Sequence, residues 1–171
     1  MPFWYSLFYM GLLGIMAHWI GEALPRKWFC WEKFPYRVWF WEREGKIYDR
    51  LGIRTWKDRL PDKSRVVKGM VPKKVGICPT SCLVYRLIQE TCVAETVHFA
   101  LCFLAFPICL FWETALGIAL AWIYILCNIP FIMIQRYNRP ALISLARKLE
   151  KREERRRGAS SDSIGEHGRR S

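Results

Sequence analysis

Three long apolar runs divide the chain, and each has the length of a helix that crosses a lipid bilayer. The first, Pro2 to Leu24, contains one acid and no Lys or Arg, and the third, Thr114 to Ile134, has 21 residues without a charge. The second, Val93 to Trp112, is apolar apart from two ionisable side chains. A hydrocarbon core of about 30 Å needs roughly 20 apolar residues. The pattern therefore predicts an all-α integral membrane protein with about three transmembrane helices, at about 2–24, 93–112 and 114–134.

Two other interpretations of this pattern are disfavoured. A cleaved signal peptide normally has basic residues before its apolar part and a small-x-small cleavage site after it, and the N-terminal run has neither. A soluble three-helix protein would spread its apolar residues more evenly, whereas here they are segregated into runs.

The basic residues predict the orientation of the chain. All 27 Lys and Arg lie in two segments, Arg26 to Arg86 and Arg136 to Arg170, and the turn near Glu113 has none. The positive-inside rule therefore places the N-terminus outside and both basic segments, with the C-terminus, in the cytoplasm. The net charge of +12 is then explained by this orientation and by anionic lipid headgroups as partners. Nucleic-acid binding is the disfavoured interpretation of the same charge.

The cytoplasmic segment 25–89 opens with the aromatic segment, residues 27–44, "KWFCWEKFPYRVWFWERE". Rings interleaved with charges favour the headgroup layer, so this stretch is expected to lie on the membrane surface. The following "KIYDRLGIRTWKDRLPD" predicts a short helix, a turn at Gly52 and a second short element that ends at Pro61. A longer helix is expected to begin near Thr80 or Ser81 and to run into the membrane.

The C-terminal part divides at Pro140. Residues 140–157, "ALISLARKLEKREERRR" after the proline, predict a basic amphipathic helix, and 158–171 predict a disordered tail. Residues 1–157 would thus form a single membrane domain.

Polar residues converge on one layer when the second and third spans are folded antiparallel about Glu113. His98 lies 15 residues before this turn and Asn128 lies 15 after it, so the two are expected at the same depth. By the same count Glu90 falls level with Arg136, and Gln89 falls level with Tyr137. The first span adds His18 and Glu22 near its cytoplasmic end.

Glu95 and His98 are spaced i, i+3 and therefore share one helix face. Ionisable residues at membrane depth usually face the bundle interior and are candidates for function, although a structural pair at the interface is the alternative. A histidine that is oriented by a carboxylate has the arrangement of a general base. Asn, Gln and Arg side chains nearby could hold an oxyanion or a phosphate.

Metal chemistry is the weaker interpretation of these residues. Glu-x-x-His is one unit of a di-iron site, but "HWIGE" in the first span has the wrong order and spacing to supply a second. The seven cysteines lie in the cytoplasmic segment or within the predicted spans, where disulfides are disfavoured. Cys78 and Cys82 lack the second pair that a zinc site needs. No metal and no cofactor are predicted.

Three motifs in fixed order resemble the glycosyl-4,4'-diaponeurosporenoate acyltransferase family. They are "RTWKDRLPD" (Arg54 to Asp62), "ETCVAETVHF" (Glu90 to Phe99) and "NIPFIMIQRYNRP" (Asn128 to Pro140). The likeness covers roughly Tyr48 to Leu145, more than half of the chain. It departs at Ala141, where a basic residue is common, and at Phe99, where Trp is common. These departures concern the identity of the substrate more than the activity, and His18 lies outside the family pattern.

The resemblance implies a small multi-pass protein of the bacterial cell membrane that esterifies a sugar hydroxyl of a glycolipid or glycosylated carotenoid acid with a fatty acyl group. The expected partners are this acceptor and an acyl thioester donor, acyl-CoA or acyl carrier protein. In this scheme His98, oriented by Glu95, deprotonates the hydroxyl, and Asn128 or Asn138 stabilises the oxyanion. The expected substrate-binding residues come from the same three motifs: Trp56, Lys57, Glu90, Gln135, Arg136, Tyr137 and Arg139.

Two alternatives belong to other functional classes. A non-catalytic membrane partner of a larger lipid-modifying enzyme is suggested by the small size, because three spans leave little room for both substrates. A metal-dependent membrane oxidase is the less favoured alternative.

Overall fold

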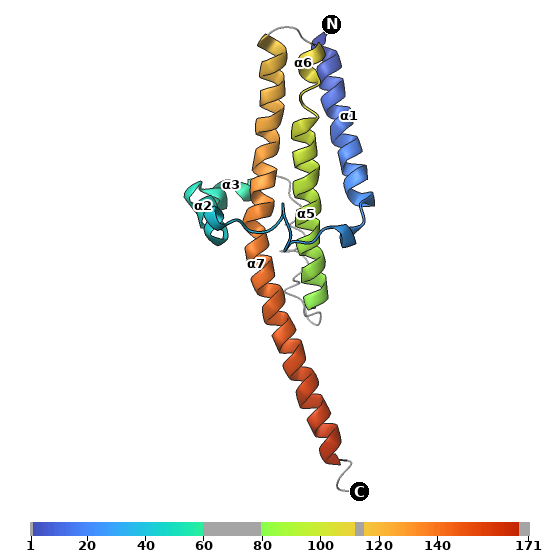
Figure 1. Cartoon of the computed structure of the whole chain (residues 1–171), viewed down its shortest axis with the longest axis vertical. Helices are drawn as coiled ribbons and strands as arrows, with labels where there is room; N and C mark the ends of the chain where they lie inside the picture. The colour runs from blue at the N-terminus through green and yellow to red at the C-terminus, as the bar shows by residue number, and fades with distance from the viewer. Residues whose placement is uncertain (1, 60–79, 112–114, 168–171) are drawn as a thin grey trace.

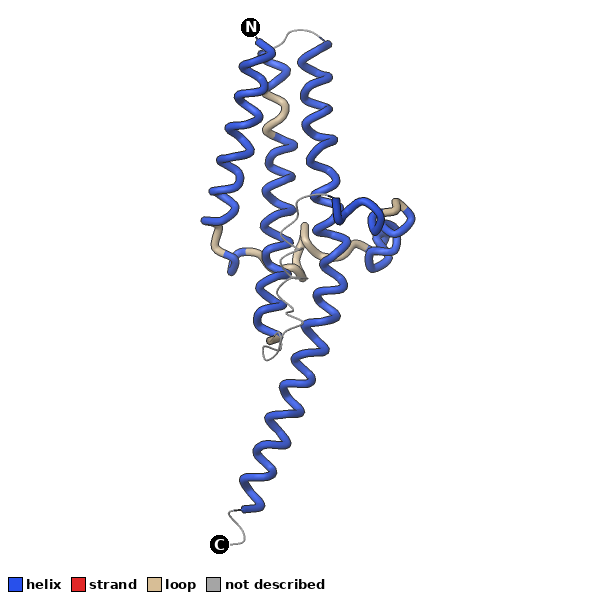
Figure 2. Tube along the Cα trace, turned by 180° about the vertical axis from the view of Figure 1, so that it is seen from behind, coloured by secondary structure: helices blue, strands red, loops and turns tan. Residues whose placement is uncertain are grey.

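The chain is all-helical throughout the described residues, as the sequence predicts. The structure, a computed structural model, describes residues 2–59, 80–111 and 115–167. Three long helices lie side by side: α1 (Pro2–Ala23), α5 (Ser81–Phe103) and α7 (Ala115–His167) (Figure 1). The view from behind shows the same arrangement, with the C-terminal part of α7 extending beyond the other helices (Figure 2).

Two of these helices are long and apolar enough to cross a membrane, the segments Phe3–Ala23 and Ala115–Gly158. Helix α1 exposes many large apolar side chains, and Trp4, Phe8 and Trp19 are each about 70% exposed. An apolar surface of this extent is typical of a helix that contacts lipid. The third expected span, 93–112, is not among the segments found, and a third crossing therefore stays a proposal.

The second apolar run is interrupted. Helix α5 ends at Phe103, and a turn at 104–107 separates it from the short helix α6 (Ile108–Phe111). Pro107 explains the break, because proline lacks an N–H donor and its ring clashes with the carbonyl four residues earlier. The second apolar run is thus not one continuous helix.

Helix α7 differs from the sequence prediction because it continues through Pro130 and Pro140 as one element of 53 residues. The sequence predicted a span that ends at 134, a separate amphipathic helix at 140–157 and a disordered tail from 158. Instead the helix extends to His167, so the predicted tail is helical over most of its length. Contacts with α5 on both sides of Pro140 keep α7 helical, and extending an established helix adds one hydrogen bond per residue.

The packing of α5 against α7 forms the core beside Pro140. Val84 and Ile88 of α5 contact Ile143 and Ala146 of α7, and all four side chains are buried. Burial of each large aliphatic side chain contributes about 1.5–3 kcal/mol. This interface therefore offsets the hydrogen bond that Pro140 removes from α7.

Helix α5 begins where the sequence predicts, with Thr80 as its N-cap. The carboxylate of Glu153 on α7 accepts hydrogen bonds from the amide and the hydroxyl of Ser81, at 2.9 and 2.7 Å. Negative charge at a helix N-terminus is stabilising. The lower end of α5 is thereby fixed to α7.

Between α1 and α5 the chain forms short elements: η1 (Arg26–Trp28), η2 (Phe40–Gly45), α2 (Lys46–Arg50), α3 (Ile53–Trp56) and η3 (Lys57–Arg59). The expected turn at Gly52 is confirmed, and its φ of 65° is a conformation that glycine adopts without strain. The expected end of the second element at Pro61 lies outside the described residues. Several rings of the aromatic segment are exposed, yet this segment also crosses between α5 and α7 and supplies part of the site.

Candidate active site

A buried cluster of ion pairs joins α5 and α7 where the apolar part of α7 ends. Glu95 on α5 has no exposed surface, and its two carboxylate oxygens accept hydrogen bonds from Arg136 Nη1 and Arg139 Nη2, each at 2.5 Å. Both arginines belong to α7. Three ionised side chains are therefore held together in the interior, where unpaired charges are costly.

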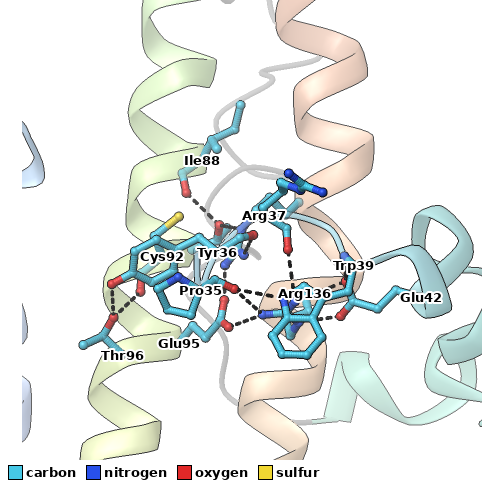
Figure 3. Close-up of polar contacts among 12 residues, drawn as sticks. Pro35, Tyr36, Arg37, Trp39, Glu42, Ile88, Cys92, Glu95, Thr96 and Arg136 are labelled. Carbon is cyan, nitrogen blue, oxygen red and sulfur yellow. Dashed lines mark hydrogen bonds and ion pairs between the residues drawn. The ribbon is translucent and has the colours of Figure 1, made fainter. Parts of the chain in front are cut away.

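Arg136 also binds the aromatic segment. Its Nε and Nη2 donate to the two carboxylate oxygens of Glu42, at 2.5 and 3.2 Å. Its remaining donors reach the backbone carbonyls of Pro35, at 3.2 Å, and Arg37, at 3.3 Å (Figure 3). One guanidinium on α7 thus connects α5 with three residues of the segment between α1 and α2.

Arg139 has the largest of the fully buried side chains in the described residues, with 1% of its surface exposed. Its Nε donates to Thr91 Oγ1 at 2.9 Å, and its Nη1 donates to the carbonyl of Tyr36 at 2.6 Å. Both arginines therefore bind carbonyls of the aromatic segment, and Glu95 and Glu42 balance their two charges.

Burial disfavours the charged form of Glu42, but hydrogen bonds from Arg136, Tyr48 and the Trp39 amide outweigh it and hold the pKa of this carboxyl below its ordinary value. The same carboxylate, together with burial, raises the pKa of the Tyr48 hydroxyl. Glu42 is therefore an ionised acceptor at neutral pH, and Tyr48 is a donor.

The depth matching of His98 with Asn128 is confirmed. His98 Nδ1 and Asn128 Oδ1 are 2.8 Å apart, and Asn128 Nδ2 donates to the carbonyl of Tyr124 at 2.9 Å. The imidazole also stacks on Phe131, with ring centroids 4.7 Å apart and 8° between the planes. Two contacts thus fix both the position and the plane of the ring.

This geometry selects one tautomer of neutral His98. The amide oxygen of Asn128 only accepts hydrogen bonds, so Nδ1 must carry the proton and the basic lone pair is on Nε2. A histidine held in this way has the form that a general base needs. The hydrogen bond from Asn128 Nδ2 to Tyr124 supports this orientation of the amide.

An open cleft of about 810 Å³ lies further along α7, between this helix and the elements α2 and α3. Its ionisable lining is strongly basic: Arg54, Lys57, Arg147, Lys148 and Lys151, against the single acid Asp49. The cleft therefore favours an anionic ligand.

The end of the cleft nearest the apolar layer is formed by two of the three family motifs. Lys57 Nζ is 3.4 Å from Asn138 Oδ1 and lies 4.6 Å above the ring of Tyr137. Arg54 Nε donates to the Tyr137 hydroxyl at 3.1 Å. Lys57, Tyr137 and Asn138, which the sequence assigns to the site, are thus neighbours in space although they lie about 80 residues apart.

Several expected relations differ in the structure. Glu95 was expected to orient His98, but its carboxylate binds Arg136 and Arg139. In these contacts Asn128, which binds His98 Nδ1, orients the imidazole instead. Asn128 and Asn138 are ten residues apart on α7, which is about 15 Å, and cannot serve the same reacting carbon.

The remaining expected positions divide between the site and the scaffold. Glu90 binds Arg26, at 2.8 and 2.9 Å, and not Arg136. His18 is exposed on α1 beside Trp19. Gln135 is 5% exposed beside Arg136, and Trp56 packs against the buried cluster of Tyr48, Ile53 and Ile134. Trp56 and Gln135 are thus both packed against other parts of the protein. The role of Gln135 as a substrate contact stays a prediction.

Four residues of the site were missed by the sequence analysis: Arg26, Tyr36, Glu42 and Thr91. Glu42 lies 94 residues from its partner Arg136, among other acids of the aromatic segment. No spacing rule identifies such a pair. Within the described residues, no three His, Cys, Asp or Glu side chains are grouped so that they could hold a metal ion.

Comparison with known proteins agrees with the family that the motifs indicated. A family model described as glycosyl-4,4'-diaponeurosporenoate acyltransferase matches residues 25–148. Two relatives of that name, from Staphylococcus aureus strains bovine RF122 / ET3-1 and N315, are 27% and 26% identical over 139 residues, which is 80% of this chain and 82% of each relative. No solved structure matches the chain. The matched range contains the whole ion cluster, His98 and Asn128.

We expect Glu95→Gln to lower the free energy of unfolding by about 3–5 kcal/mol, because it leaves two buried guanidinium groups without their shared anion. Arg136→Lys should also destabilise, since one ammonium cannot reach the acceptors on α5 and in the aromatic segment at once. Unfolding in detergent, followed by circular dichroism, measures both effects.

The matched control is Glu22→Gln, because Glu22 lies 3.7 Å from Arg26 with 47% of its side chain exposed. Such surface pairs contribute about 0–1 kcal/mol. Equal stability losses in Glu95→Gln and Glu22→Gln would contradict a supporting role for the cluster.

The lowered pKa of Glu42 leads us to expect that the stability of the protein depends on pH. The pKa of Glu42 is lowered in the folded protein, so its stabilisation is present above the ordinary value of 4.5 and is lost as the pH falls through the lowered folded value. Glu42→Gln should therefore be less stable than the wild type at neutral pH, and the difference should shrink at acid pH. Thermal unfolding across this range tests it, and a difference independent of pH would show that charge is not the cause.

Proposed function

Because the chain belongs to the glycosyl-4,4'-diaponeurosporenoate acyltransferase family, we propose that it esterifies a sugar hydroxyl of a glycosylated lipid or carotenoid acid with a fatty acyl group from a thioester. Its class as an acyltransferase follows from the family and from the names of the relatives. The observation that carries the proposal is the contact between His98 Nδ1 and Asn128 Oδ1, which prepares Nε2 as a base within the apolar layer.

In the proposed reaction His98 Nε2 takes the proton of the acceptor hydroxyl while the oxygen attacks the carbonyl carbon of the thioester. The tetrahedral intermediate then expels the sulfur, and the imidazolium returns its proton to the thiolate. The products are an ester and a thiol, so atoms and charge balance. Asn128 keeps the base lone pair on Nε2 and is thus a positioning residue.

The surroundings of His98 suit lipid substrates. Exposed apolar side chains lie along α5 and α7 near it: Phe99 is 43% exposed, Phe103 is 70% exposed and Leu126 is 59% exposed. A fatty acyl chain or a polyene can lie along such a surface without desolvating a polar group. The hydroxyl of an amphiphilic acceptor would then be held at the depth of His98.

The basic cleft suits the polar end of the donor. An acyl thioester of coenzyme A or of a carrier protein has phosphate groups, and Arg54 and Lys57 are placed to bind them. The cleft at Asn138 lies about 15 Å along α7 from Asn128. That interval matches the arrangement of such a donor, in which an extended pantetheine arm separates the phosphate from the thioester.

We place the protein in the bacterial cell membrane with its N-terminus outside and the C-terminal part of α7 in the cytoplasm. The two helices that can span a membrane, the segments Phe3–Ala23 and Ala115–Gly158, support a membrane location. The segregation of Lys and Arg supports the orientation. The upper part of α5 with α6 is the proposed third crossing, which would bring the site to the cytoplasmic leaflet.

We expect His98→Ala to lower the transfer rate by about 10²–10⁴, the usual contribution of a general base. Asn128→Ala should also lower kcat, because Nδ1 loses the acceptor that selects the tautomer. The assay uses purified protein in nanodiscs with a glycolipid acceptor and a labelled acyl thioester. His18→Ala is the matched control, because His18 is the exposed histidine of α1. Full activity of His98→Ala would remove this residue from the mechanism.

We expect Lys57→Ala and Arg54→Ala each to raise KM for the donor about tenfold with little change in kcat, because charge-assisted hydrogen bonds of this kind contribute about 1.5–3 kcal/mol. Arg86→Ala, an exposed basic residue on α5 outside this cleft, should leave KM unchanged. An unchanged KM in both cleft variants would show that the donor binds elsewhere.

A further inference from the structure

The C-terminal part of α7 has two acids that face α5 and a group of basic residues on the opposite side. Two of its acids are turned towards α5, where Glu150 accepts a hydrogen bond from Tyr85 at 3.0 Å and Glu153 binds Ser81. These carboxylates hold the helices together. Beyond Glu153, no other described helix lies beside α7 (Figures 1 and 2).

The opposite face of α7 is a basic stripe, which we define as Lys148, Lys151, Arg152 and Arg155. Lys148 lies three and four residues before the adjacent Lys151 and Arg152, and Arg155 lies four and three residues after them, so the four share one side of the helix; all four are exposed. Lys148 and Lys151 also line the basic cleft. The stripe therefore leads from Arg155 directly into the cleft that is proposed to receive the donor.

The position of the stripe separates it from the membrane surface. The apolar part of α7 ends at Ile134, so Lys151 lies 17 residues, or roughly 25 Å, further along the helix axis. The headgroup layer occupies only about 5–8 Å of that distance. The attraction of anionic lipids falls off within a Debye length of about 8 Å. Because α7 stays helical through Pro140, its stripe extends away from the bilayer and does not lie on it.

We propose that the basic stripe is the docking surface for a small, acidic, soluble carrier protein that presents the acyl group as a thioester on a phosphopantetheine arm. This inference rests on the proposed function and names its donor. The complementary charge favours a protein with an acidic helical surface. The arm then enters the cleft, where Arg54 and Lys57 bind its phosphate, and the thioester extends towards His98.

An acyl thioester of coenzyme A fits the stripe less well than a carrier protein does. Its phosphates would occupy the cleft, but Arg152 and Arg155 lie outside the cleft lining, further along the helix. A folded acidic partner, in contrast, can contact the cleft rim and the whole stripe at once.

The test measures binding of a fluorescently labelled, fatty-acylated acyl carrier protein to the full-length protein in phosphatidylcholine nanodiscs, by fluorescence anisotropy. The variant is Lys148→Glu with Lys151→Glu. The matched control is Arg86→Glu with Arg157→Glu, which makes the same change in net charge at exposed positions away from the stripe. We expect the stripe variant to raise Kd at least tenfold, the control to change Kd less than twofold, and salt to weaken binding to the wild type.

Three results would overturn the proposal. One is the absence of carrier binding to the wild type, and another is an equal loss of binding in the stripe variant and its control. The third is loss of carrier binding in nanodiscs that contain phosphatidylglycerol, which would assign the stripe to the lipid surface.

Transfer by the wild type from a short acyl-pantetheine thioester, which has no carrier protein, separates this inference from the proposed function. Turnover with that donor, together with no carrier binding, would overturn only the docking surface. Carrier binding that depends on the stripe, without turnover from either donor, would support the surface and count against the acyl-transfer mechanism.

Discussion

The arrangement of the protein depends on the ion pairs that the carboxylate of Glu95 forms with Arg136 and Arg139. This carboxylate lies fully buried between two guanidinium groups of α7, and those groups in turn bind Glu42 and three carbonyls of the aromatic segment. A buried ion pair is not in itself a strong source of stability, because desolvation opposes it, but its partners tolerate little displacement. The cluster therefore selects one register between α5 and α7, and that register brings His98 to Asn128.

Structural and chemical roles follow one another along a single helix. Asn128 positions the candidate base, the two arginines hold the scaffold, Asn138 belongs to the basic cleft, and the stripe follows beyond it. No buried side-chain polar atom in the described part of the chain lacks a hydrogen-bond partner. The arginines after the third apolar run are thus mainly structural. They lie between the His98–Asn128 pair on one side and the basic cleft on the other.

Periodicity and counting from the turn predicted the local features of the fold. The start of α5 at Thr80, the glycine turn at Gly52 and the level of His98 with Asn128 each depend on local rules or on one antiparallel count. Glu95 could be identified as a buried acid, but its partner could not, because arginine side chains reach across several residues of register. Glu42 could not be found at all, since its pairing with Arg136 requires the path of an irregular segment. The continuity of α7 was missed because a proline can be read from the local sequence, whereas the packing of α7 on both sides of Pro140 depends on distant residues.

The continuity of α7 has a mechanical consequence. With 53 residues, the helix is about 80 Å long and joins an apolar half to a basic half without a break in the helix. In the proposed membrane orientation, a transmembrane helix adjusts its tilt to the local thickness of the hydrocarbon layer. A change of tilt in the apolar half therefore turns the basic half through the same angle and moves its far end sideways. The position of the cytoplasmic end of α7 therefore depends on the thickness of the surrounding lipid.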